Sequence, residues 1–140
     1  MSVVRIAVAQ GVGAMDFPDP GSIREQGRRV RELMGLAADG GARLVVFTEG
    51  ALSGLPDARI MSSDPDRRAE ADWSRVDWQV LDAERQRTIE RAGELGLWTV
   101  VGSLHREPGF GLPVACADRP VEGVVIRESR VGAVERGIGA

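Results

Sequence analysis

Three short apolar runs divide the first hundred residues of the chain. They are VVRIAVA at 3–9, RLVVF at 43–47 and LWTVVG at 97–102. Apolar and β-branched residues at nearly every position are typical of strands buried on both faces, as in a parallel sheet. We therefore predict strands near 3–9, 43–48 and 97–102, with the first of them in the interior of the sheet.

Two amphipathic segments separate these runs. The first has a capping box at its start, formed by Ser22 and Glu25, and it should end at Gly40–Gly41. The second is predicted from about Asp77 to Leu95, with Gly96 as its stop signal. The apolar positions at helical spacing are Ile23, Val30, Leu33, Met34 and Ala37 in the first and Leu81, Thr88, Ala92 and Leu95 in the second.

The order β-α-β-α-β predicts the α/β fold class, with mainly parallel strands joined by right-handed crossovers. The polar residues 57–72 should form a surface loop or a short helical turn, and VEGVVIRES at 121–129 allows one more strand. VGAVERGIGA at 131–140 has no stable period. We therefore predict a domain part at 1–107 and a divergent tail at 108–140.

Composition and charge exclude several classes of function. The chain has 140 residues, 43% hydrophobic content and a net charge of −3, and its scattered basic residues argue against nucleic-acid binding. It has no apolar run near the ~20 residues of a membrane span and no signal-peptide pattern, so a cytoplasmic location without a membrane partner is expected. A single cysteine, Cys116, permits no intrachain disulfide and fits a reducing compartment.

Neither a cofactor nor a metal is predicted from the sequence. The Gly-Val-Gly at 11–13 lacks the third glycine of a dinucleotide fingerprint, and a proline-bearing loop follows it instead of a helix. No group of Cys, His and Asp has metal-ligand spacing. His105, the single histidine, is interpreted as an exposed loop residue, with an acid or base role as the alternative.

Glu49 is the strongest candidate for chemistry. It follows the second predicted strand, and Gly50, Gly54 and Pro56 then open a loop. Open α/β sheets place their ligands at the carboxyl ends of strands, and apolar neighbours there would partly desolvate a carboxylate, as a general base requires. The alternative is a glutamate that caps the next turn or pairs with an arginine.

Four segments of the chain have a familiar order and spacing. They are VVRIAVAQ at 3–10, AADGGARLVVFTEG at 37–50, ALSGLP at 51–56 and ERAGELGLWTVVGS at 90–103. On these segments the N-terminal three-quarters of the chain, about residues 3–105, resembles the nitrilase, or carbon–nitrogen hydrolase, superfamily, most specifically at 41–56. Thr48 departs from the family pattern, in which proline commonly precedes the glutamate.

This resemblance implies an α-β-β-α sandwich and a Glu–Lys–Cys triad that hydrolyses a small amide, nitrile or carbamoyl compound. Glu49 matches the family's glutamate, the general base. Cys116, in CADRPVE, has a faint likeness to the nucleophile motif, with an inert buried thiol as the alternative. The chain contains no lysine, and the planar guanidinium of Arg106 or Arg127 is a poor substitute for an ammonium.

We therefore predict a carbon–nitrogen hydrolase by resemblance that is inactive in this chain, its authentic reading frame ending near residues 105–110. The chain would then hold only about the first half of the sandwich, and the uncovered face of its sheet should expose apolar strand surface. The expected binding partner of the hydrolase is its substrate, a small amide or nitrile. One alternative is a non-catalytic α/β binding or dimerisation module, whose exposed sheet would pair with a full-length relative or form a homo-oligomer. The other is an unrelated doubly wound domain that binds a small ligand at its strand ends.

Overall fold

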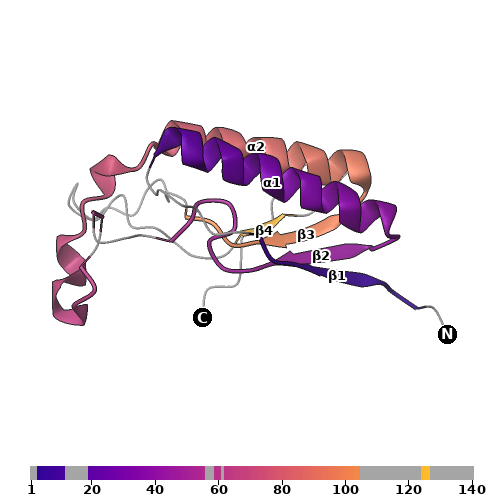
Figure 1. Cartoon of the computed structure of the whole chain (residues 1–140), viewed down its shortest axis with the longest axis horizontal. Helices are drawn as coiled ribbons and strands as arrows, with labels where there is room; N and C mark the ends of the chain where they lie inside the picture. Colours follow the sequence, from indigo (N-terminus) through magenta and orange to yellow (C-terminus); the bar gives the residue numbers. More distant parts are fainter. Residues whose placement is uncertain (1–2, 12–18, 56–58, 61, 105–123, 127–140) are drawn as a thin grey trace.

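Two long helices lie side by side over one face of a four-stranded sheet (Figure 1). The computed structural model describes residues 3–11, 19–55, 59–60, 62–104 and 124–126. The helices and strands are β1 (Ile6–Ala9), α1 (Pro20–Asp39), β2 (Leu44–Phe47), the 3₁₀ helices η1 (Pro65–Glu70) and η2 (Trp73–Arg75), α2 (Trp78–Leu95), β3 (Trp98–Val101) and β4 (Val124–Ile126).

The strands lie in the sheet in the order of the chain, β1-β2-β3-β4. β1, β2 and β3 are parallel, whereas β4 runs antiparallel to β3. The two crossovers contain α1 and α2, as a β-α-β-α-β sequence requires. The predicted α/β class and the mainly parallel order are therefore confirmed, and β4 lies within the predicted strand at 121–129.

The start of α1 differs from the prediction. Asp19, not Ser22, caps the helix, because its carboxylate accepts the backbone N–H of Ser22 at 2.8 Å. Pro20 then occupies the first helical position, where its fixed φ and missing N–H are tolerated. Glu25 is therefore not part of a capping box, and its side chain pairs with Arg28 and Arg29 instead.

The other helix boundaries agree with the prediction. α1 ends before Gly40, where Ala42 N–H bonds to the carbonyl of Ala37 at 2.9 Å. α2 begins after Asp77, whose carboxylate accepts the N–H of Val80 at 3.1 Å, and it ends at Gly96. Both ends follow from the capping chemistry of residues that flank the apolar stripes.

The hydrophobic core fills the space between the helices and one face of the sheet. Alternate strand residues face the helices because successive side chains in a strand point to opposite sides. On the sheet these are Val45, Phe47, Thr99 and Val101, and on the helices they include Ile23, Val30, Met34, Leu81, Thr88 and Ala92.

The opposite face of the sheet consists of two rows of apolar residues in register. Ile6, Leu44 and Trp98 form one row, and Val8, Val46 and Val100 form the next. Helices α1 and α2 do not cover this face (Figure 1), and Val8 is 81% exposed. We call these six residues the open face. The expectation of exposed apolar strand surface is thus confirmed.

The predicted position of the first strand in the interior of the sheet is wrong. β1 pairs only with β2 among the described strands, so it lies at the edge. Ile6 is 56% exposed, and Val3 and Val4 before it are exposed as well. Apolar residues on both faces of a strand indicate burial only if a second layer covers the sheet.

Candidate functional site

Glu49 lies at the carboxyl edge of the parallel strands, two residues after the end of β2. Its side chain is exposed, so the partial desolvation predicted for it is not found. It has no ion pair or side-chain hydrogen bond within the described part of the chain, so the alternative of an arginine-paired glutamate is not found there either. Position in the fold, rather than burial, makes this carboxylate a candidate for chemistry.

The loop that carries Glu49 turns tightly at Gly50. Gly50 has φ +65°, and the N–H of Gly54 bonds to its carbonyl at 2.7 Å. A Cβ at position 50 would lie 2.9 Å from the carbonyl oxygen of Gly54, closer than real side chains come to backbone. Glycine is therefore required here for both conformation and space.

The same loop is fixed to the segment that follows β3. Leu52 N–H bonds to the carbonyl of Gly102 at 3.2 Å, and the buried hydroxyl of Ser53 accepts the N–H of Leu104 at 3.2 Å. A Cβ at Gly102 would lie 2.9 Å from the nitrogen of Gly50 and 3.1 Å from the Cα of Glu49. Direct backbone packing therefore positions Glu49 relative to the end of β3.

A hollow of about 40 Å³ opens between α1 and this loop. It has room for about three water-sized groups, since one needs roughly 10–15 Å³. Glu49 and Arg29 are the charged residues on its wall. The lining residues are Gly11, Gln26, Arg29, Val30, Leu33, Phe47, Thr48, Glu49, Gly50 and Ala51. The hollow thus combines a carboxylate, a guanidinium and apolar groups at the carboxyl ends of β1 and β2.

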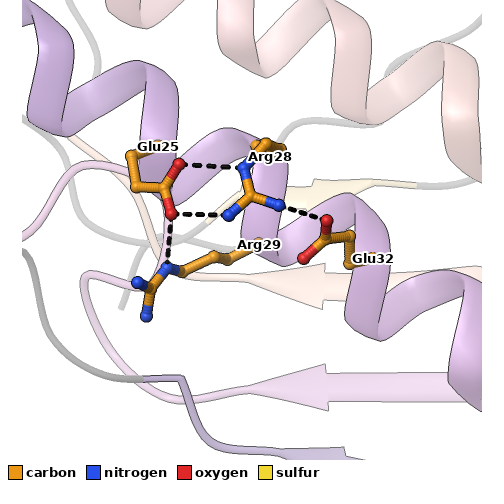
Figure 2. A network of polar contacts seen from close by, with 4 residues as sticks. All are labelled: Glu25, Arg28, Arg29 and Glu32. Carbon is orange, nitrogen blue, oxygen red and sulfur yellow. Dashed lines mark hydrogen bonds and ion pairs between the residues drawn. The ribbon is translucent and has the colours of Figure 1, made fainter.

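Arg29 belongs to a network of charged residues along α1, shown in Figure 2. Arg28 donates to both carboxylate oxygens of Glu25, at 2.8 and 2.6 Å, and also pairs with Glu32. Arg29 donates its Nε to Glu25 at 2.9 Å, and its two Nη atoms lie on the side away from that carboxylate (Figure 2). Chiefly the hydrogen bonds from Arg28, and next those from Arg29, lower the pKa of Glu25 to about 2.

A second carboxylate, Glu84, is buried between the helices. It is 2% exposed and pairs with Arg31 of α1 at 2.6 Å and with Arg87 of its own helix. Glycine at position 27 lets this carboxylate pack directly against the backbone of α1. Leu81 and Thr88 belong to the apolar stripe of α2, and residue 84 lies on the same buried face. A charged residue on that stripe is the signal in the sequence from which a buried, paired Glu84 could have been predicted.

Of the residues that the sequence indicates as candidates for chemistry, Glu49 lines the hollow, together with the glycines Gly11 and Gly50. Cys116, His105, Arg106 and Arg127 lie outside the described residues. Arg29 and Gln26 were not singled out from the sequence, although Gln26 is a polar residue on the apolar stripe between Ile23 and Val30.

The described part of the chain contains no group of three or more His, Cys, Asp or Glu side chains arranged to hold a metal ion. Neither of its long helices has the apolarity that crossing a membrane requires.

Comparison with known proteins gives a match at the level of the fold. No family model matches the sequence, and no curated protein matches it either. Among solved structures, an amidase from Nesterenkonia sp. is similar, with 21% sequence identity and a TM-score of 0.52 over 74% of this chain. The chain spans about a third (33%) of the length of that amidase. At this identity the similarity shows a shared α/β fold.

Proposed function

We propose that this chain contains the base-bearing part of a carbon–nitrogen hydrolase that acts on small amides, with Glu49 as the base. The supporting observation is the position of Glu49 at the carboxyl edge of a parallel sheet, in a fold that an amidase shares. The close packing at glycines 50 and 102 holds the loop in place, so the backbone that carries the exposed carboxylate has a defined position.

In the proposed mechanism Glu49 accepts the proton of the nucleophile as it attacks the amide carbon. It then returns that proton to the departing amine, so one carboxylate acts as base and acid in turn. The tetrahedral intermediate develops a negative charge on oxygen that needs a positive partner. Because the chain has no lysine to supply an ammonium, we propose that it binds amides at Glu49 but does not turn them over.

The test combines a turnover assay with a binding assay on the full 140-residue protein. We expect no release of ammonia from acetamide or propionamide, and a weaker binding of either amide in Glu49→Gln. Glu94→Gln is the matched control, because Glu94 lies on α2 and pairs with Arg91 away from the hollow. Equal binding by both variants would show that Glu49 is not at an amide site. Ammonia release abolished by Cys116→Ala would instead show a complete enzyme.

The open face supports a second candidate function, a dimerisation module. Its six residues are all apolar, so two copies would meet without charge repulsion, and sheets in sandwiches pack in this way. Sedimentation of the full chain tests it: Val8→Glu should shift a dimer toward monomer. Leu36→Glu is the control, because Leu36 is equally apolar and 67% exposed but lies on α1. A monomer at every concentration would rule out this candidate.

A further inference from the structure

Arg29 and Glu49 share the wall of the hollow but do not neutralise each other. In the described part of the chain Arg29 has its one ion pair with Glu25, through Nε. That contact occupies one edge of the guanidinium and leaves the end with both Nη atoms on the other side (Figure 2). The Nη end presents parallel N–H donors with the spacing that suits the two oxygens of a carboxylate.

The volume of the hollow limits what fits. About 40 Å³ accommodates a planar group of three heavy atoms, such as a carboxylate or an amide, but not a whole drug-sized ligand. The apolar wall of Val30, Leu33 and Phe47 lies beside the charged groups. It reduces the exposure of a bound carboxylate to water, which strengthens its attraction to a guanidinium.

Among anionic ligands, the surrounding charges disfavour a doubly charged one most. Glu25 and Glu49 both lie near Arg29, so a doubly charged phosphate would meet two carboxylates for one guanidinium. A ligand that also carries an N–H group would instead donate a hydrogen bond to Glu49. The hollow thus combines a donor for a carboxylate with an acceptor for an amide N–H.

We propose that a small amide that carries a carboxylate binds here, with the carboxylate in the hollow on the Nη atoms of Arg29 and the amide outside it, its N–H directed at the exposed Glu49. That this ligand is the substrate class of the site rests on the proposed function, whereas the binding itself does not. Arg29 is then the residue that selects acidic amides over neutral ones.

The experiment is an NMR titration of the full chain with N-acetylglycine. We expect Arg29→Gln to weaken binding roughly tenfold or more, since a charge-assisted bidentate contact is lost. Arg28→Gln is the matched control and should change the affinity less than about twofold, because Arg28 also pairs with Glu25 on α1 but does not line the hollow. Arg29→Lys should give an intermediate affinity, because it keeps the charge and loses the planar fork.

A ligand comparison on the unaltered protein removes any dependence on folding of the variants. The neutral N-acetylglycinamide should bind at least about tenfold more weakly than N-acetylglycine, and inorganic phosphate should not compete. Equal affinities for the acid and the neutral amide, equal effects of Arg28→Gln and Arg29→Gln, or no binding at all would each overturn the proposal. Competition by phosphate at similar concentration would show a general anion site and overturn it as well.

The two proposals fail in different ways. If N-acetylglycine binds through Arg29 but Glu49→Gln leaves the binding of acetamide and N-acetylglycine unchanged, the hydrolase proposal and the amide contact with Glu49 are both wrong, and only the carboxylate contact with Arg29 remains. If Glu49→Gln weakens amide binding while Arg29→Gln has no effect on N-acetylglycine, the carboxylate site is wrong and Glu49 keeps its proposed role.

Discussion

Glu84 and Glu49 place the same side chain in opposite surroundings. Glu84 is enclosed between α1 and α2, where two arginines pair with its oxygens and the backbone of Gly27 contacts it. Glu49 is exposed at the carboxyl edge of the sheet and has no such partner among the described residues. The backbone of the loop, rather than the side chain, is what the fold fixes at Glu49.

The difference separates a structural carboxylate from one available for chemistry. A buried charge is tolerated when its hydrogen bonds are supplied, and its partners then occupy every approach to it. A carboxylate that keeps free lone pairs in a defined place can take a proton or an N–H group from a ligand. Substitutions at the two glutamates, and at the glycines beside them, should therefore have very different effects.

The largest effect is expected for Glu84→Gln. Losing the charge removes the ion pair with the partly buried Arg31, and the free energy of unfolding should fall by about 3 kcal/mol. Urea denaturation measures it, with Glu94→Gln on the exposed side of the same helix as the control. A loss below about 1 kcal/mol would mean that the ion pairs of Glu84 contribute little to stability.

Gly27→Ala tests the packing of Glu84 from the side of α1. The new Cβ would overlap Glu84 Oε2 and lie 2.8 Å from its Cδ, so the carboxylate must move, at a cost of about 2 kcal/mol. Gly35→Ala on the same helix meets only Arg91 Nη2, at 3.5 Å, and should stabilise the protein by about 0.5–1 kcal/mol through helix propensity. Thermal or urea melts that give both variants the same sign would contradict this packing.

At the other glutamate, Gly102→Ala should disturb the loop without touching the side chain. Its Cβ would press on the backbone of residues 49 and 50, and we expect a loss of about 1–2 kcal/mol in the free energy of unfolding. NMR shift changes should concentrate in the loop. Gly11→Ala is the control, because its Cβ meets nothing within 4 Å, and unchanged stability is expected. Equal stability of the two alanine variants would contradict the close backbone contact at Gly102.

A smaller, pH-dependent effect is expected at Glu25, whose pKa is lowered from 4.5 to about 2. A lowered pKa contributes stability above about pH 4.5, and this contribution is lost as the pH falls through 2. Urea denaturation from pH 5 to pH 2 should show a shallower decline for Glu25→Gln than for the unaltered chain. Arg28→Gln, which removes the largest cause of the shift, should also flatten the decline, and parallel curves for all three proteins would refute the pairing.

The smallest effect on stability is expected for Glu49→Gln, within about 0.5 kcal/mol. Its side chain is exposed and makes no contact that the fold needs. Ligand titrations should nonetheless reveal the substitution through weaker amide binding. A marked drop in the melting temperature would instead assign Glu49 a structural role and remove its contrast with Glu84.

Local chemistry explains which parts of the fold were predictable. Both ends of α2 were predicted correctly, at Asp77 and Gly96. An N-cap residue and a C-terminal glycine act on the helix within one turn, so the local sequence is sufficient to place them. The start of α1 was misplaced because two caps compete there, and Asp19 followed by Pro20 prevails over Ser22 with Glu25.

Features that depend on distant packing were not predictable in this way. The exposure of Val8 depends on which layer lies against β1, and no pattern within the strand encodes that. Glu49 was found because a strand end is a local signal. Arg29 was not found, because its place beside Glu49 depends on how α1 lies over the β2 loop.

The order of the strands has a consequence for how the protein folds during synthesis. β2 and then β3 each pair with the strand made just before, so the sheet can grow while the chain leaves the ribosome from its N-terminus. The loop carrying Glu49 receives its backbone partner only when Gly102 has been made, some fifty residues later. The scaffold of this site is therefore completed after most of the core residues have been synthesised.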